Sequence, residues 1–316
     1  MTGTGPPVRI SLGAALMAAA IGRPTRAQEI EPRAYAATPP GALFAGVALG
    51  YTTGGVVLEA TSPVTDVRAH VTTGSLAVGG TFAFFGRTAS AAIGLPYAWA
   101  RISGNVFEEA QSVKRVGLAD ARLRLAVGLL GGRAMSLQEF ARRKPSTYVG
   151  TSVTIAMPTG QYYSDKLINV GTNRWAFKPE IGASRPSGPW TVELHAGAWF
   201  FMRNTSFFPD QTKAQDPLVS LQSHVGYTFR PRLWITGNVV FYAGGRAVID
   251  GAPAPERQEN TRVGLTASVP VTQSHAVKLA WSKGAITRVG SSFVTWTAAW
   301  QTTMIRRPPR PAVGRG

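Results

Sequence analysis

The chain has 316 residues, of which 35 are glycine, 22 are proline and only 16 % are charged. Abundant glycine and sparse charge are typical of a β-rich protein with many turns, and they argue against a helical soluble enzyme. The absence of cysteine excludes disulfide bonds and thiolate metal sites. The formal net charge is +17, but the basic residues are dispersed and no recognition motif accompanies them, so we expect no nucleic-acid partner.

The N-terminus has the pattern of an export signal. Arg9 precedes an apolar stretch that runs from Ile10 to Ile21, and Thr25-Arg26-Ala27 places small residues at the −3 and −1 positions of a cleavage site. This stretch is shorter than the roughly 20 residues that a membrane-spanning helix needs, and no later stretch is long enough. We therefore predict a signal peptide over 1–27, whose removal takes away three arginines and lowers the net charge from +17 to +14.

The rest of the chain reads as short segments of alternating polarity. In Trp190–Ala198, one parity is apolar and the other holds Thr, Glu, His and Gly. Because residues i and i+2 share one face of a strand, such a segment has an apolar face and a polar face, as a transmembrane β-barrel requires. Twelve strands are predicted, at 42–51, 73–85, 88–101, 117–130, 147–157, 174–184, 189–202, 218–229, 232–243, 260–270, 275–283 and 291–303.

The connections alternate in length. Links after even-numbered strands are short, such as Gly86-Arg87 and Arg230-Pro231, whereas links after odd-numbered strands, such as 52–72 and 158–173, are long. Short periplasmic turns and long outer loops are the asymmetry of a closed antiparallel barrel with both termini in the periplasm. We therefore predict an all-β fold, with a periplasmic N-terminal segment at 28–41, an outer-membrane barrel at 42–305 and a basic, proline-rich tail at 306–316.

One link after an even-numbered strand is longer than the others and is predicted to contain a helix. Ser136-Leu137-Gln138-Glu139 has the pattern of a capping box, which predicts a short periplasmic helix over 135–142. Pro96 and Pro179 lie inside predicted strands, where each removes a donor from the hydrogen-bond ladder. We expect a bulge or a kink at both prolines.

The two faces of the predicted strands differ in chemistry. Aromatic and aliphatic residues such as Leu194 and Trp300 are expected to face lipid, where a charge costs about 2–4 kcal/mol at the midplane. Outer-membrane lipid, lipopolysaccharide and the outer-membrane assembly machinery are therefore the expected partners. The residues predicted to line the lumen are Asp120, Arg122, Arg124, Lys178, Glu180, Glu193, His195, Gln222, His224, Asn238 and Lys278.

Catalytic and metal-binding motifs are not evident. The four histidines, His70, His195, His224 and His275, lie on separate segments without metal-ligand spacing, and there is no nucleophile elbow, P-loop or dinucleotide fingerprint. We expect no enzyme activity, no metal and no cofactor. The lumen charges leave two interpretations open: a constriction that selects solutes, or ion pairs that plug the interior.

A run in the second half of the chain resembles a known family. The sequence Pro158-Thr159-Gly160-Gln161-Tyr162, followed by Lys166 to Gly182, closely resembles the phenol degradation meta-pathway family of outer-membrane transporters. Its most specific part is Asn169, Val170, Gly171, Thr172, Asn173, Arg174 and Trp175. Further matches are Trp199-Phe200-Phe201 with Asn204, Gln215–Leu218, Tyr242 with Gly244-Gly245, Asp250-Gly251 and Asn260–Gly264.

This resemblance implies a barrel in the outer membrane of a diderm bacterium that admits hydrophobic or aromatic compounds. We therefore expect passive uptake of a small hydrophobic solute. The alternative is a structural or adhesive barrel with a plugged lumen, and an enzyme with a Ser–His pair is a third hypothesis. One departure from such barrels is that Trp300 is not terminal but is followed by further residues and the basic tail.

Overall fold

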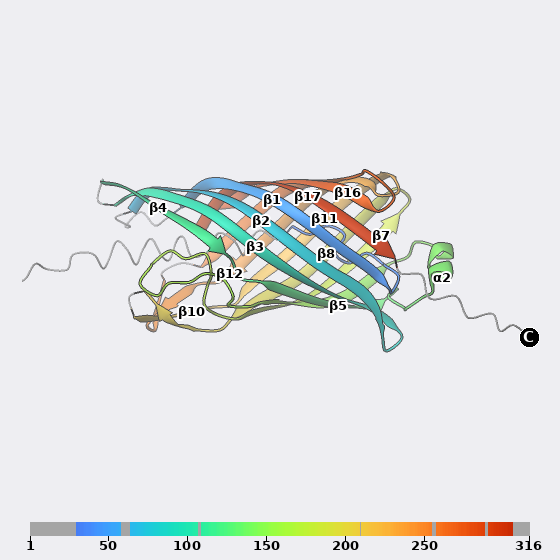
Figure 1. Cartoon of the computed structure of the whole chain (residues 1–316), viewed down its shortest axis with the longest axis horizontal. Coiled ribbons are helices and arrows are strands. Elements are labelled where there is room, and N and C mark those ends of the chain that lie inside the picture. The colour runs from blue at the N-terminus through green and yellow to red at the C-terminus, as the bar shows by residue number, and fades with distance from the viewer. Residues whose placement is uncertain are drawn as a thin grey trace, which may run out of the picture.

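The chain forms one closed β-barrel with a smaller sheet at one end (Figure 1). The computed structural model describes residues 30–57, 64–106, 109–208, 210–254, 257–287 and 290–305. The predicted signal peptide at 1–27 and the basic tail at 306–316 lie outside these residues. Both remain predictions.

The barrel wall is an antiparallel sheet in which thirteen strands are hydrogen-bonded. Two of them, β4 and β5, pair with successive parts of β3, so they share one position and the described wall has twelve positions. Pairing of β2 with β3 and of β1 with β17 closes the ring. The strands are β1 (Ala42–Val57), β2 (Val64–Phe84), β3 (Arg87–Val106), β4 (Glu109–Leu118), β5 (Arg122–Leu130), β6 (Tyr148–Ala156), β7 (Ala176–Ser187), β8 (Trp190–Phe201), β11 (Leu218–Arg230), β12 (Leu233–Gly244), β15 (Gln258–Pro270), β16 (His275–Thr287) and β17 (Gly290–Ile305).

The predicted twelve-stranded barrel is confirmed, and its strand ends need correction. The predicted link 52–72 is largely strand, because β1 and β2 extend to Val57 and Val64. The links 203–217 and 244–259 contain four short strands in a second sheet, β9 (Asn204–Phe207), β10 (Gln211–Gln215), β13 (Ala247–Ile249) and β14 (Ala252–Pro253). This sheet lies at the end of the barrel opposite the helix α2 (Figure 1). We call these two ends the loop end and the helix end.

Helix α2 (Leu137–Arg142) has the predicted capping box. The Ser136 Oγ accepts a hydrogen bond from the Glu139 N–H, and the Glu139 carboxylate accepts one from the Ser136 N–H at 2.8 Å. These bonds satisfy donors that a helix start leaves free. No helix in the described part of the chain is long and apolar enough to cross a membrane.

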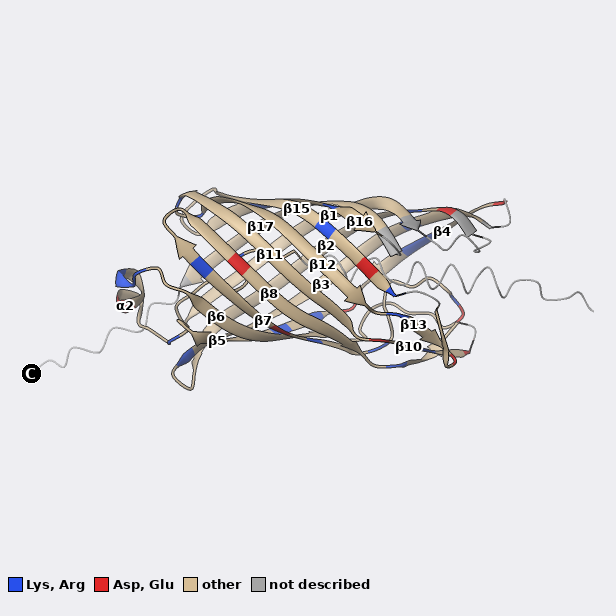
Figure 2. Cartoon of the chain, turned by 180° about the vertical axis from the view of Figure 1, so that it is seen from behind, with Lys and Arg blue, Asp and Glu red and all other residues tan. Residues whose placement is uncertain are grey.

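The outer surface of the wall is apolar, as the alternation predicts. Leu76, Leu95, Trp99, Leu194 and Trp296 are all exposed, whereas the charged residues of the opposite parity on β7 and β8 are buried in the lumen. Charged positions are sparse along the strands (Figure 2). An apolar outer band is the surface that lipid requires.

The alternation reverses near the loop end of β2 and β3. There Arg68, His70 and Arg101 are exposed on the outside, while Val71 and Ile102 are buried inside. Polar residues outside and apolar residues inside are typical of a sheet in water. The reversal therefore marks where these strands leave the membrane, and it gives the lumen an apolar lining there that we did not expect.

The two prolines behave differently. Opposite Pro96 the ladder breaks, because Gly94 pairs with Arg122 but Tyr97 pairs with Leu118, which is a register shift of one residue. The predicted irregularity is therefore present at Pro96. At Pro179 the ladder is interrupted without a bulge: pairing of β7 with β8 is lost at 178–179 and resumes in the same register at Glu180.

The lipid-facing surface gives a first testable prediction. Leu194 is 59 % exposed within β8, and Phe229 is 63 % exposed beside the turn between β11 and β12. Leu194→Arg should lower the free energy of unfolding by about 2–4 kcal/mol, while Phe229→Arg should lower it by only about 0–1 kcal/mol, because the interface hydrates the charge. Urea titration of the protein folded into vesicles measures both values. Equal costs would contradict the assignment of the lipid-facing band.

Candidate solute pathway

The N-terminal segment lies inside the barrel. Its Arg33 N–H donates to Glu193 Oε2 at 2.6 Å, and the Arg33 guanidinium donates to Thr228 Oγ1 and lies 4.7 Å from the centre of the Trp234 ring. The segment predicted at 28–41 as periplasmic is, from Ile30 onward, held by lumen side chains of the barrel. Alternation could not show this, because the segment is not a strand.

Tyr35 is the most deeply placed side chain of this segment. Only 2 % of its surface is exposed, and its hydroxyl donates to Glu180 Oε1 at 3.0 Å and pairs with Ser152 Oγ at 2.9 Å. The ring lies against Gly150 and Gly182, which pair across β6 and β7, and a Cβ at Gly182 would lie 2.1 Å from the ring. Two facing glycines thus form the recess that receives this tyrosine.

Burial, together with the nearby Glu180 carboxylate, raises the pKa of Tyr35. The phenol therefore stays protonated at neutral pH and can act as a donor.

Four of the predicted lumen residues form a buried polar network around Tyr35. Lys178 Nζ lies 2.7 Å from Glu180 Oε2, and the His195 ring meets the Tyr35 ring edge-on at 4.7 Å. Glu193 Oε2 lies 3.7 Å from His195 Nε2. Because the two carboxylates also accept bonds from the N-terminal segment, these residues fasten that segment to the wall.

The other predicted lumen residues are distributed more widely. Arg122, Arg124 and Lys278 line a cavity of about 710 Å³ beside the N-terminal segment, towards the helix end. Arg124 also donates to Ser152 Oγ at 3.2 Å. The described segment thus narrows the lumen without filling it.

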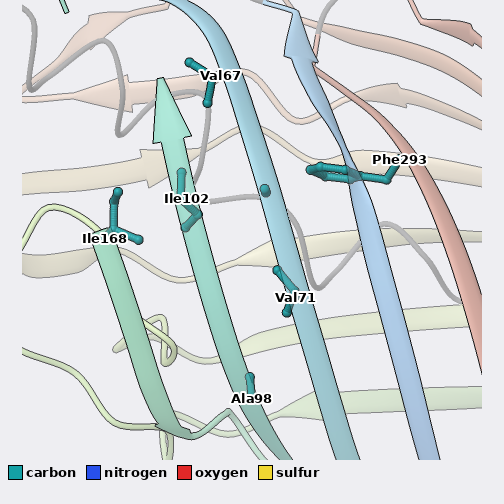
Figure 3. Close-up of a cluster of buried hydrophobic side chains, with 7 residues drawn as sticks. Val67, Val71, Ala98, Ile102, Ile168 and Phe293 are labelled. Carbon is teal, nitrogen blue, oxygen red and sulfur yellow. The ribbon is translucent and has the colours of Figure 1, made fainter. Parts of the chain in front are cut away.

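An apolar chamber lies at the loop end. Val67, Val71, Ala98, Ile102 and Phe293, which come from β2, β3 and β17, form one apolar cluster with Ile168 of the connection between β6 and β7 (Figure 3). This contact borders a cavity of about 80 Å³, whose apolar walls also include Ala100, Leu167, Val170 and Phe207. Residues 157–175, which we call the inner loop, therefore fold into the mouth of the barrel.

The inner loop also covers a gap in the wall. Within the described residues β4 pairs only with β3, because β6 ends at Ala156 below the level of β4. The exposed edge of β4 meets the loop instead: the Gln161 N–H donates to the Leu118 carbonyl at 2.8 Å. At this point of the wall, the loop takes the place of a strand beside β4.

Asp120 joins the two limbs of the inner loop. Its Oδ1 accepts from the Gly160 N–H at 3.1 Å, while its Oδ2 accepts from the Thr172 N–H at 3.1 Å and from the Thr172 hydroxyl. The limbs cross closely where Gly160 meets Gly171, and a Cβ at Gly171 would lie 2.5 Å from the Gly160 backbone. The structure thus places Asp120 beside the family motif, a connection that strand alternation did not reveal.

The remaining motif residues shape the same loop. Asn169 closes a turn through bonds to both backbone groups of Tyr163. Asn173 adopts a φ of +50° and donates to Asn204 of β9 at 3.0 Å. Arg174 is buried, bonds to Gln215 of β10 and lies 4.7 Å from the centre of the Phe201 ring, while Trp175 is exposed and stacks on Phe177. The motif therefore positions the loop against both sheets.

No group of three or more potential metal ligands occurs among the residues that the structure describes.

The glycine recess gives a second prediction. Tyr35→Ala should raise single-channel ion conductance at least twofold, because the largest side chain of the N-terminal segment is removed from the lumen. The control is Tyr51→Ala, which alters an exposed tyrosine of β1. Planar-bilayer recording measures both variants. Unchanged conductance in Tyr35→Ala would show that this ring does not limit the passage.

A third prediction concerns the carboxylate that joins the loop limbs. Asp120→Ala removes an acceptor of three hydrogen bonds, so local opening of the inner loop should become more frequent. Limited proteolysis with trypsin should then cut after the exposed Lys166 at least fivefold faster. Asp216→Ala, which breaks an exposed ion pair with Arg246, is the control and should leave this cleavage rate unchanged.

Comparisons with solved structures place this architecture among outer-membrane barrels. The chain resembles an outer membrane channel from Pseudomonas putida F1 with 20 % identity and a TM-score of 0.75, over 87 % of this chain and all of that one. A monoaromatic hydrocarbon channel, CymD, matches with 9 % identity and a TM-score of 0.46, over 85 % and 90 % of the two chains. The β domain of the Bordetella autotransporter BrkA matches with 11 % identity and a TM-score of 0.47, over 83 % and 99 %.

A search of the curated proteins finds no match. A family model, described as "Putative MetA-pathway of phenol degradation", matches residues 47–301. This match spans most of the chain and nearly the whole barrel. The chain therefore belongs to this family, which is the one that the Asn169–Trp175 motif indicated.

Proposed function

We propose that the protein is a passive outer-membrane channel for small hydrophobic solutes, including aromatic ones. The observation that carries this proposal is the apolar chamber inside the loop end, which borders the part of the wall where the inner loop replaces a strand. A channel for hydrophilic solutes has a polar, water-filled lumen. Here one side of the chamber presents an apolar surface to the solute, formed by Val71, Ala98 and Ile102.

The geometry supports a route in two stages. An apolar solute enters the chamber and transfers its surface from water to the aliphatic lining, which is favourable by about 25 cal/mol per Å². The N-terminal segment then blocks a straight descent, since Arg33 and Tyr35 are fastened to lumen residues. Onward movement requires either a shift of that segment or displacement of the inner loop towards lipid. We propose that the helix end faces the periplasm, as the short turns there support.

A structural barrel with a plugged lumen is the second candidate. The observation in its favour is the buried network that holds Tyr35, with Glu180, Ser152 and His195 around it. The cavity of about 710 Å³ beside the segment and the chamber above it support the channel instead, since a structural plug has no need of either space.

Filling the chamber tests the channel proposal. Ala98 is buried in the chamber wall, and Ala91 lies on the lipid-facing parity of the same strand. Ala98→Trp should lower uptake of radiolabelled toluene at least fivefold in cells that express the protein, because the indole occupies the space that the solute needs. Ala91→Trp should leave uptake within twofold of the unaltered protein.

The controls separate transport from folding. Both variants should show the shift in gel mobility between unboiled and boiled samples that a folded barrel gives, since overpacking alone costs about 1–3 kcal/mol. Suppose that cells expressing the unaltered, folded protein take up toluene no faster than cells without the protein. This result would overturn the channel proposal in favour of the structural barrel.

A further inference from the structure

We infer that the outer surface of the barrel carries a site at the loop end for the phosphate groups of lipid A, the membrane anchor of lipopolysaccharide. The site consists of Arg68 on β2, Arg101 on β3 and Lys114 on β4, which are all exposed. The inference goes beyond the proposed solute route. It relies on the proposed orientation, in which the helix end faces the periplasm and the loop end reaches the outer leaflet.

The three cations all point away from the lumen. Arg68 lies between Val67 and Ala69, which are 2 % and 1 % exposed and belong to the apolar cluster inside the barrel. Arg101 precedes Ile102 and Lys114 follows Val113, and both of these neighbours also contact that cluster. Because successive side chains of a strand point to opposite faces, the cations share the outer face of the wall.

The register brings the cations together. Arg101 pairs directly with Lys114 on one side and with His70 on the other, and Arg68 occupies the next outward position of β2 beyond His70. Neighbouring strands lie about 4.8 Å apart, so these side chains form one patch across three strands.

The patch lacks an anion of its own. Like charges directly opposite each other on a sheet are destabilising, and Arg101 faces Lys114 in this way. Among the residues that the structure describes, neither side chain forms an ion pair with a carboxylate. An anion from outside the chain that lies between the two side chains would offset their repulsion.

The position of the patch selects an anion that belongs to the membrane. Trp99 is 45 % exposed on the same face, two residues before Arg101, and its ring lies 4.7 Å from that of Tyr97. Exposed Leu95 and Leu76, which pair with each other, continue this face towards the helix end. Aromatic belts lie at the level of the lipid headgroups, and two residues of strand span about 7 Å. Arg101 therefore lies just beyond the apolar band, at the level where lipid phosphates are found.

Lipid A matches both parts of this surface. Its phosphate groups suit an arginine, which can donate two parallel hydrogen bonds, beside a lysine, which acts as a point charge. Its acyl chains can lie against Leu95 and Trp99, directly below the patch. Free phosphate gains only the first of these contacts, so a lipid is the ligand that uses the whole surface.

The first test measures binding of fluorescently labelled lipid A by anisotropy. The full chain is used in uncharged detergent micelles near pH 7, with a chelator present to remove divalent cations. Lipid A with both phosphates should bind at least tenfold more tightly than the same lipid without phosphates. Millimolar inorganic phosphate should leave this binding within twofold.

Matched variants locate the site. Lys114→Gln and Arg101→Gln should each weaken binding of the phosphorylated lipid at least fivefold. Arg185→Gln is the control, because Arg185 is also an exposed arginine on the outer parity of a strand but lies near the helix end, opposite the apolar Val192. It should leave the affinity within twofold. All three variants should keep the gel shift of a folded barrel.

A stability measurement separates lipid binding from a purely structural role. In phosphatidylcholine vesicles, the urea midpoint of Lys114→Gln should equal or exceed that of the unaltered protein, because the like-charged pair is removed. In vesicles that also contain lipid A, the midpoint of the variant should instead be the lower of the two. A lysine with only a structural role would lower the midpoint in both kinds of vesicle.

Three results would overturn the inference: equal binding of the two lipids, displacement of lipid A by inorganic phosphate, or equal weakening by Arg185→Gln. The last result would indicate a general attraction between a cationic protein and an anionic lipid. None of these results bears on the channel proposal, which toluene uptake tests separately.

Discussion

The structure depends on the requirement that every backbone N–H and C=O group within lipid has a hydrogen-bond partner. A strand edge in hydrocarbon leaves such groups unpaired at a cost of several kcal/mol each, so the sheet must close on itself. Closure is complete around most of the ring, from the β1–β17 pairing to the β2–β3 pairing. At β4 it is not, because β6 ends too early to supply a partner. Most of β4 lies beside the part of β3 that has left the membrane, where water can pair with the strand edge, and at the membrane end of β4 the inner loop supplies a partner, since the Gln161 N–H donates to the Leu118 carbonyl.

The same constraint explains why one loop carries so much of the specific chemistry. A loop that replaces a strand has no ladder to hold it, so side chains fix its path. Asp120 joins its two limbs, Asn169 closes its turn, and Arg174 connects it to the smaller sheet. Most residues of the motif shared with the family therefore serve to hold this loop in place. The apolar chamber is the space that remains between the loop and the inner faces of β2 and β3.

Most of the barrel could be predicted from the sequence, because the alternation of apolar and polar side chains along each strand shows which face points to lipid and which to the lumen. The alternation within β8 alone places Leu194 outside and Glu193 inside, without any information about the neighbouring strands. The pathway could not be predicted in the same way. Tyr35 is placed by Gly150 and Gly182, which are distant in the chain and look like ordinary strand glycines. One signal was present in the sequence: on Val67–Val71 the charged residues occupy the outer parity, which indicates that the hairpin rises out of the membrane and turns an apolar face inward.

The placement of the N-terminal segment has a consequence for the order of assembly. Residues 30–41 lead directly into β1, and β1 is joined along its length to β17, the last strand of the sheet. The first and last strands therefore form the seam at which the cylinder is sealed. Arg33 and Tyr35 already lie within the ring that this seam completes, so the seam must be sealed around them or the segment must thread in afterwards through an open end. Sealing the seam around the segment is topologically simpler than threading the segment in afterwards. In that order, the nascent sheet can wrap around the N-terminal segment.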